Sequence, residues 1–141
     1  MELLLGTFTP KLDDKFRLIL PSKIREQLQN GLVLTRGKEE CLYILSQKEY
    51  KKMYKNILKA KGDARSTAYR LRQFTSDAEN NTPDKQGRIV VPAKLREYAN
   101  LESEVTIIGV GNHAEIWNTA ALDEYMSQKP ETDEKMDEGV F

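Results

Sequence analysis

Aspartate and arginine lie four residues apart at two places in this 141-residue chain, Asp13 with Arg17 and Asp84 with Arg88. The planar guanidinium group of arginine suits guanine edges and phosphates, and lysine supplies a point charge for a nucleic-acid backbone. We therefore interpret these turns as candidate nucleic-acid contacts. The candidate DNA-binding residues are Lys11, Lys15, Arg17, Lys85 and Arg88, together with Lys23 and Lys94 on the helices that follow.

Each turn is predicted to be fixed by its aspartate, because an aspartate carboxylate bonds backbone N–H groups nearby. Asp13, Asp84 and Gly87 are the expected turn-forming residues. A second interpretation stays open, in which the two arginines merely pair with Asp14 and Asp84 in their own turns. In that case the arginines would contact no ligand.

Both turns belong to a longer internal repeat, because residues 13–26 recur 71 residues later as residues 84–97. Of the 14 aligned positions, six are identical and four exchange one aliphatic residue for another. Ordinary composition predicts roughly one chance identity in such a window, so duplication is the better explanation. Each copy is then one supersecondary unit that needs a partner, and the two copies can partner each other.

The first copy shows the pattern of two β-hairpins around a short helix. Residues 5–12 and 17–20 are predicted to pair as the first hairpin. The helix that follows is predicted to open with Ser22 as its N-cap. Residues 32–35 and 41–45 are predicted to form the second hairpin.

The second copy predicts the same order, and longer helices follow both copies. Apolar residues at helical spacing follow Ser46, the expected N-cap, and recur after a break at residues 61–63. These further elements are strand 88–91, helix 93–99, strands 105–108 and 114–117, and three longer helices around residues 50–58, 64–75 and 119–128.

The formal net charge is zero, so the distribution of charge is more informative than its sum. Residues 48–72 hold nine basic and two acidic residues, which either add sequence-independent DNA affinity or form solvated helix faces. Residues 130–141 hold five acids and one base and are predicted to be a disordered tail. Such a tail either keeps the protein soluble or competes for a basic surface.

The sequence offers little for catalysis. Cys41 lies within a strand without a neighbouring base, and His113 sits in a turn without a nearby serine or paired carboxylate. One cysteine and one histidine exclude an internal disulfide framework and a Cys/His zinc cluster. We therefore expect no enzyme activity, no cofactor, no metal and no small-molecule substrate.

The hydropathy pattern does not predict a membrane protein. No stretch approaches the roughly 18 apolar residues needed to cross a bilayer. The apolar run at residues 3–5 is too short for a signal-peptide core and has no basic stretch ahead of it. We expect no membrane partner and a cytoplasmic location.

The repeated motif resembles that of the bacterial MraZ family over about residues 3–126. Two copies of Asp-x-x-x-Arg are each followed by aliphatic residues and proline, with residues 34–37 after the first copy and 108–117 after the second. The resemblance implies an α+β fold of two pseudo-symmetric AbrB-like, swapped-hairpin-type β-hairpin/helix repeats that form a shared barrel with flanking amphipathic helices. The implied division is 1–60 for the first repeat with its helix, 61–82 for a connecting helix and linker, 83–129 for the second repeat with its helix, and 130–141 for the acidic disordered tail.

The same resemblance implies a sequence-specific transcriptional regulator whose partner is double-stranded DNA. Members of this family bind short G-containing direct repeats upstream of an operon for division and cell-wall genes, usually their own. They assemble into rings, so a homo-oligomer associated with the nucleoid is expected here. The family's DNA-contacting motif falls on residues 13–17 and 84–88, with Lys15 and Lys85 among the phosphate contacts.

One position departs from the family pattern. The first motif usually has glycine before its arginine, as Gly87 precedes Arg88, whereas this chain has Phe16. A bulky residue disfavours a positive φ, so we expect the first tip to differ in shape from the second.

Two other functions stay open. AbrB-like folds also occur in antitoxins, whose main role is to bind a partner protein. Residues 130–141 are the segment that would do so here, by folding on contact. A purely structural ring without DNA affinity is the third possibility.

Overall fold

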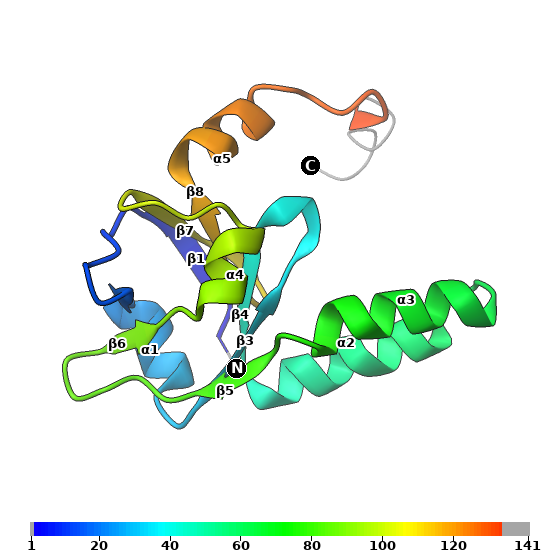
Figure 1. The fold of residues 1–141 in the computed structure, drawn as a ribbon, viewed down its shortest axis with the longest axis horizontal. Helices are drawn as coiled ribbons and strands as arrows, with labels where there is room; N and C mark the ends of the chain where they lie inside the picture. The colour runs from blue at the N-terminus through cyan, green and yellow to red at the C-terminus, as the bar shows by residue number, and fades with distance from the viewer. Residues whose placement is uncertain (1, 134–141) are drawn as a thin grey trace.

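A six-stranded sheet and a separate two-stranded ribbon organise the computed structural model, which describes residues 2–133 (Figure 1). Elements from the first copy and the segment after it are β1 (Leu4–Phe8), β2 (Arg17–Ile19), α1 (Ser22–Leu28), β3 (Leu32–Arg36), the 3-10 turn η1 (Lys38–Glu40), β4 (Leu42–Leu45), α2 (Gln47–Lys59) and α3 (Ala64–Thr75). They are followed by β5 (Glu79–Asn81), β6 (Arg88–Val90), α4 (Ala93–Tyr98), β7 (Val105–Gly111), β8 (Ala114–Asn118) and α5 (Thr119–Met126).

The large sheet contains strands from both copies. Its order is β1-β7-β8-β4-β3-β5, so β7 and β8 from the second copy lie between β1 and β4 from the first. Every pairing is antiparallel, and β1 runs beside β7 from Leu4 opposite Gly111 to Phe8 opposite Ile107. The sheet therefore cannot be divided into one part for each copy.

The ribbon pairs β2 of the first copy with β6 of the second. Leu18 lies opposite Ile89, and these residues occupy equivalent positions of the repeat, 71 residues apart. The Leu20 N–H donates to the Gly87 carbonyl oxygen at 2.9 Å, and the equivalent bond at the other end of the ribbon has the same length. The ribbon thus has a local pseudo-twofold axis between Leu18 and Ile89.

The predicted first hairpin is wrong. Residues 5–12 do not pair with residues 17–20, because β1 pairs with β7 and β2 pairs with β6. The segment between them is also held by the second copy, since the Leu12 N–H donates to the Ser103 carbonyl oxygen at 2.8 Å. When β2 pairs with β6, Leu18 and Ile89 at the strand centres are both buried in the core. This burial favours pairing between the copies over a hairpin within one copy.

The large sheet is open, with β1 and β5 at its edges. The shared barrel is therefore not confirmed, because no pairing within residues 2–133 joins the two edge strands. The sequence pattern does not predict β5, since Glu79, Asn80 and Asn81 lack the apolar alternation that marks a strand. This short polar strand pairs with β3 and forms one edge.

The short helices α1 and α4 each begin directly after a proline. At α1 the N-cap is Pro21, which makes no side-chain bond, so the predicted cap at Ser22 is wrong. Proline has a fixed φ, −55° here, that already suits a helix start, and the Pro21 carbonyl oxygen accepts from the Arg25 N–H at 2.9 Å. Ile24 of α1 and Leu95 of α4, equivalent positions of the repeat, are both buried.

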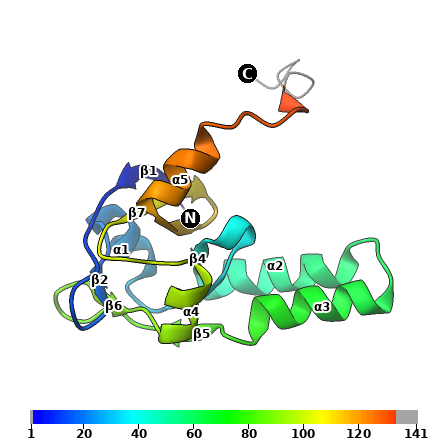
Figure 2. The ribbon, with the colours of Figure 1, turned by 45° about the horizontal axis from the view of Figure 1, so that its top comes forward.

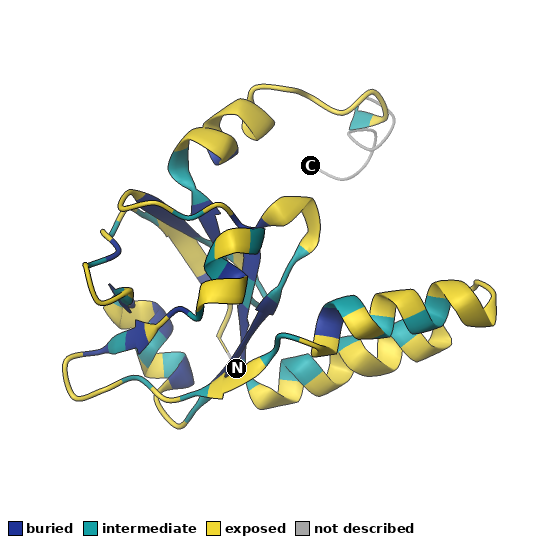
Figure 3. Cartoon of the chain, in the orientation of Figure 1, coloured by how far each residue is buried: buried dark blue, intermediate teal, exposed yellow. Residues whose placement is uncertain are grey.

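One apolar core is built from both copies (Figure 3). It draws on strands of the large sheet, on both strands of the ribbon and on α1 and α4. Burying each leucine or isoleucine contributes about 1.5–3 kcal/mol, so this core holds the two copies together. A smaller cluster of Cys41, Trp117 and Leu122 packs α5 against the sheet.

The long helices α2 and α3 form a hairpin that projects on the side opposite the ribbon (Figure 1 and Figure 2). The predicted cap at Ser46 is confirmed, since its Oγ accepts from the Glu49 N–H at 3.1 Å. The base of the hairpin is anchored where the Thr35 and Tyr50 hydroxyls donate to the Phe74 carbonyl oxygen at 2.7 and 3.1 Å. Neither these helices nor any other within residues 2–133 is long and apolar enough to cross a membrane.

Candidate nucleic-acid interface

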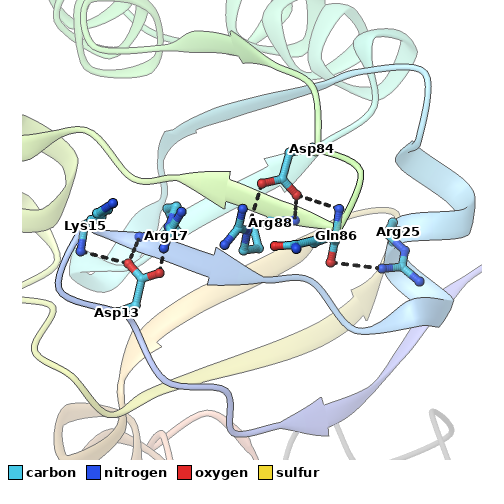
Figure 4. Close-up of polar contacts among 7 residues, drawn as sticks. All are labelled: Asp13, Lys15, Arg17, Arg25, Asp84, Gln86 and Arg88. Carbon is cyan, nitrogen blue, oxygen red and sulfur yellow. Dashed lines mark hydrogen bonds and ion pairs between the residues drawn. The ribbon is translucent and has the colours of Figure 1, made fainter.

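The first Asp-x-x-x-Arg turn, residues 13–17, is organised by the Asp13 carboxylate (Figure 4). Its Oδ1 accepts from the backbone N–H groups of Lys15 at 2.9 Å and Arg17 at 2.8 Å. Its Oδ2 accepts from Arg17 Nε at 2.7 Å. The Asp13 N–H closes the loop by donating to the Arg17 carbonyl oxygen at 3.0 Å. We call this segment loop 1.

The second turn, residues 84–88, repeats these bonds one for one, and we call it loop 2 (Figure 4). Asp84 Oδ1 accepts from the N–H groups of Gln86 and Arg88, both at 2.9 Å. Asp84 Oδ2 accepts from Arg88 Nε at 2.8 Å. The Asp84 N–H donates to the Arg88 carbonyl oxygen at 2.9 Å. The predicted turn-forming aspartates are thus placed where they bond the backbone of their own loops.

These bonds hold the two carboxylates in their charged form. The backbone N–H of Arg17 is the largest influence that lowers the pKa of Asp13 below its ordinary value of 3.8. The backbone N–H of Arg88 lowers the pKa of Asp84 in the same way. Each aspartate therefore remains an anion at neutral pH and fixes the orientation of its arginine.

The ion pair of loop 1 differs from the one expected. Arg17 pairs with Asp13, not with Asp14, because Asp13 begins the loop and faces its N–H groups. Arg88 pairs with Asp84 as the second interpretation held. Only Nε of each guanidinium is used in the bonds found within residues 2–133. Pairing and ligand contact are therefore compatible, since the terminal nitrogens can still donate to guanine or phosphate.

The ribbon brings both arginines to one face. Along β2 the side chain of Leu18 is buried while Arg17 before it is not, and β6 repeats the pattern with Ile89 and Arg88. Because side chains alternate across a strand, both arginines lie on the outer face of the ribbon. The strands are antiparallel, so loop 1 and loop 2 lie at opposite ends of this face.

The two tips share one backbone shape despite their different residues. Phe16 has a φ of 62° and Gly87 a φ of 79°, so the expected difference in shape is wrong. The Phe16 N–H donates to the Asp13 carbonyl oxygen at 3.0 Å, and the Gly87 N–H donates to that of Asp84 at 2.9 Å. The loop bonds therefore hold phenylalanine in a conformation that glycine adopts freely.

Each tip is covered by an arginine from the other copy, a contact that sequence reasoning missed. The Arg96 guanidinium lies 3.5 Å from the centre of the Phe16 ring. At loop 2, Arg25 Nη1 approaches the Gln86 carbonyl oxygen at 3.5 Å. A Cβ built on Gly87 would overlap the Arg25 guanidinium. Arg25 and Arg96 occupy equivalent positions of the repeat, so the covering is reciprocal.

The predicted lysines are distributed unevenly around the ribbon. Lys15 and Lys85 are exposed within the loops themselves. Lys11 lies just ahead of loop 1, in an isolated β-bridge with Glu104. Lys23 is exposed in the first turn of α1. Lys94 of α4 is also exposed, and it lines a hollow with Asp77 and Tyr98, among other residues.

The basic segment of residues 48–72 lies away from this face. It forms most of the α2–α3 hairpin, which projects on the opposite side of the molecule (Figure 1). No residue of α2 is fully buried, as expected for a helix with a solvated face. The arrangement favours the solvated-face interpretation of these bases over a surface continuous with the ribbon.

The groups considered for catalysis are used structurally. Burial raises the pKa of the Cys41 thiol, which donates to the Lys38 carbonyl oxygen at 3.1 Å. His113 does have a nearby carboxylate, contrary to expectation, with Nε2 3.7 Å from Glu115 Oε2. Burial raises the pKa of Glu115, but the neighbouring His113 ring and the bond donated by Trp117 Nε1 lower it more. Residues 2–133 contain no group of three or more histidine, cysteine, aspartate or glutamate side chains that could hold a metal ion.

Comparison with known proteins matches both copies of the repeat. The model of one protein family, described as "MraZ protein, putative antitoxin-like", matches residues 3–72 and 74–139. The transcriptional regulator MraZ of Micrococcus luteus is 46% identical over 141 residues, covering 97% of this chain and 99% of that protein. The protein of the same name from Kocuria rhizophila has the same identity and coverage. That from Bifidobacterium longum is 46% identical over 129 residues, covering 92% of this chain and 86% of its own length. This chain belongs to the MraZ family.

Proposed function

We propose that this chain is a transcriptional regulator that binds double-stranded DNA through loop 1 and loop 2. Its relatives are named transcriptional regulators. The observation that carries the proposal is the paired geometry of Arg17 and Arg88, which both lie on the outer face of the ribbon and both bond the aspartate of their loop through Nε. A two-stranded ribbon fits the major groove of B-DNA, where arginine bonds O6 and N7 of guanine.

The proposed roles follow from where the side chains lie. Arg17 and Arg88 contact guanine, while Lys15 and Lys85 contact phosphates beside the loops. Lys11, Lys23 and Lys94 add charge for the DNA backbone at longer range. The turn-forming residues Asp13, Asp84 and Gly87 hold the loops in shape.

The proposed targets are short G-containing direct repeats upstream of an operon for division and cell-wall genes, usually the chain's own. The chain acts as a ring-shaped homo-oligomer whose subunits engage successive repeats. Tethering raises the effective concentration of each later contact, which accounts for tight binding by a chain of zero net charge. A cytoplasmic, nucleoid-associated location belongs to the same proposal.

The proposal includes the organisation of the chain into two AbrB-like, swapped-hairpin units. These are residues 1–60 and 83–129, joined by residues 61–82. The exchange of β2 and β6 between copies supports this division, because each unit completes its pairing with the other.

Fluorescence-anisotropy titration at two salt concentrations tests the function. One duplex carries tandem G-containing direct repeats, and the other has the same bases scrambled. The wild type is expected to prefer the repeats and to lose affinity steeply with salt, because phosphate contacts release counterions. Replacing Arg17 or Arg88 by alanine is expected to cost about 1–3 kcal/mol of binding free energy and to relax specificity.

Two further variants test whether the preference for the repeats comes from the arginines of the loops. Arg65→Ala/Arg72→Ala removes two exposed positive charges from α3 and is expected to keep the preference for the repeats. Arg17→Lys/Arg88→Lys keeps the charge of the loops but loses the planar fork, so discrimination should fall more than salt dependence. Equal, weak binding of the wild type to both duplexes would refute the proposed function.

The alternative is an antitoxin-like module that binds a partner protein through residues 130–141. The description of the matched family contains the word antitoxin-like, which keeps this alternative in view. Most of the segment, residues 134–141, lies outside the described part of the chain. Deleting residues 130–141 separates the two functions, since DNA binding should survive the deletion and a tail-dependent partner should be lost.

A further inference from the structure

Two aliphatic side chains lie on the outer face of the ribbon. Ile19 exposes 55% of its surface and Val90 52%, whereas their neighbours Leu18 and Ile89 expose 0% and 1%. Ile19 and Val90 are equivalent positions of the repeat, so both copies turn an aliphatic residue outward at the same place. An outward strand position that faces only water is normally polar. The pair therefore indicates a surface that makes a contact.

The register places these two residues against the arginines. Arg17 lies opposite Val90, and Ile19 lies opposite Arg88. Residues opposite each other have Cβ atoms about 4.5–5.5 Å apart, and residues two apart on one strand are separated by roughly 6.6 Å. Each aliphatic side chain thus has one arginine across the ribbon and another along its own strand. We call these four residues the quartet.

The quartet combines two hydrogen-bonding cations with two apolar groups on one narrow face. Phosphate binding alone would use the arginines and leave the aliphatic side chains in water. The major groove offers both kinds of partner, because guanine presents O6 and N7 and thymine presents its 5-methyl group. A groove in which thymine lies close to guanine is therefore complementary to the whole quartet.

We propose that Ile19 and Val90 contact thymine methyl groups beside the guanines that Arg17 and Arg88 bind. This inference rests on the proposed function and names the second base that the ribbon recognises. Base pairs rise 3.4 Å along DNA, so the spacing within the quartet corresponds to about two base-pair steps. The thymines concerned lie within two steps of a contacted guanine.

Replacing thymine by deoxyuridine tests the inference at the level of one methyl group. The wild-type chain is titrated with the repeat-bearing duplex and with duplexes in which single thymines are replaced by deoxyuridine, which leaves the hydrogen-bonding edge intact. Burying one such carbon contributes about 0.8 kcal/mol, so each contacted methyl group should be worth roughly fourfold in affinity. The loss should be confined to thymines within two steps of guanine.

The variant Ile19→Ala/Val90→Ala completes a double-mutant cycle. It should bind the thymine duplex more weakly than the wild type and bind the thymine and deoxyuridine duplexes equally well. Val110→Ala is the matched control, because Val110 is an aliphatic residue of β7 that exposes 43% of its surface and lies outside the ribbon. It should keep the wild-type ratio between the two duplexes.

The outcomes separate this inference from the function on which it rests. A wild type that prefers repeats over a scrambled duplex but ignores every deoxyuridine would overturn the inference alone. So would an Ile19→Ala/Val90→Ala variant that keeps the wild-type sensitivity. A changed assembly size of that variant in light scattering would assign the aliphatic pair to contact with a second copy instead. A wild type without any preference for the repeats would overturn the proposed function as well.

Discussion

Loop 1 and loop 2 share their hydrogen bonds and differ at the tip, where one has Phe16 and the other Gly87. A residue other than glycine in the left-handed region costs about 1–3 kcal/mol. Phe16 nevertheless adopts a φ of 62°, because bonds to Asp13 on both sides of the tip define the turn. The aspartate at the start of the loop, more than the tip residue, determines the shape.

The difference between the tips is explained by the residue that covers each one. Arg96 stacks on the Phe16 ring and compensates part of its strain. Arg25 fills the space above Gly87 that a side chain would need. The residue tolerated in one copy therefore depends on a side chain from the other copy, and a single copy taken alone would not explain either tip.

Truncating the buried side chains at the centre of the ribbon should have the largest effect on stability, because the ribbon positions both loops. Leu18→Ala and Ile89→Ala are each expected to lower the free energy of unfolding by about 2–5 kcal/mol, since both side chains are fully buried. Urea denaturation measures the loss. The double variant should lose less than the sum, because the two residues face each other. Ile19→Ala, at an exposed neighbour, should change stability by about 0.5 kcal/mol or less.

Placing a side chain at the tip of loop 2 should sharpen the comparison. Gly87→Ala is expected to destabilise the fold by about 1–3 kcal/mol, because Gly87 has a φ of 79° and Arg25 occupies the space. Thermal unfolding followed by circular dichroism measures it. In the double variant Gly87→Ala/Arg25→Ala, the part of the stability loss that comes from overlap with Arg25 should be recovered. The part that comes from the positive φ should remain. An unchanged melting temperature for Gly87→Ala would contradict this account.

Replacing the arginine that covers each tip should have smaller effects on stability. These effects should differ between loop 1 and loop 2. Arg96→Ala is expected to cost about 1–2 kcal/mol, because it removes a cation–π contact at 3.5 Å from an exposed ring and the bond that Arg96 Nη1 donates to the Val91 carbonyl oxygen. Arg25→Ala should cost less than about 0.5 kcal/mol, since its bond to loop 2 is long and exposed. The two effects are compared by urea denaturation. In a Phe16→Gly background, the cost of Arg96→Ala should fall by the cation–π part, and the part due to the bond to the Val91 carbonyl oxygen should stay.

Protonation of Asp13 and Asp84 by acid should weaken the bonds that both loops share. We expect this effect to be the smallest, because both carboxylates are open to solvent. The folded pKa of Asp13 and of Asp84 lies below 3.8, so their contribution to stability is complete above that pH. It is lost as the pH falls through the folded pKa values. The wild type should therefore be more stable than Asp13→Asn/Asp84→Asn at pH 7 and pH 5, and the gap should close below pH 3.8. A gap that stays constant to pH 2.5 would contradict the ionic role.

Local patterns in the sequence predict most of the elements. The hairpin of β3 and β4, the cap at Ser46 and the helices after the two prolines all depend on neighbouring residues, and the structure confirms them. The pairing of β1 and β2 could not be predicted in this way. A duplicated chain offers each strand two chemically similar partners, and the nearer one in sequence is not the one that buries Leu18 with Ile89.

The sequence predicts which residues form the candidate site better than it predicts the contacts that they make. The spacing of aspartate and arginine predicts two equal turns, and both exist. The steric argument for Phe16 was wrong because it weighed the tip alone and not the bonds around it. The contacts of Arg25 and Arg96 depend on which copy packs on which, and that arrangement is only visible in three dimensions. The DNA-binding roles of the arginines and lysines stay predictions.

The exchange of strands between copies also has a consequence for synthesis of the chain. When β2 has been synthesised, it still lacks β6, its partner 71 residues downstream. At about 5–20 residues per second, the partner follows roughly 4–14 s later. During that interval Leu18 lacks Ile89 opposite it, and the buried residues of α1 lack the part of the core that the second copy supplies. The core also includes residues of β7 and β8, so it can be completed only after Ile116 has been synthesised.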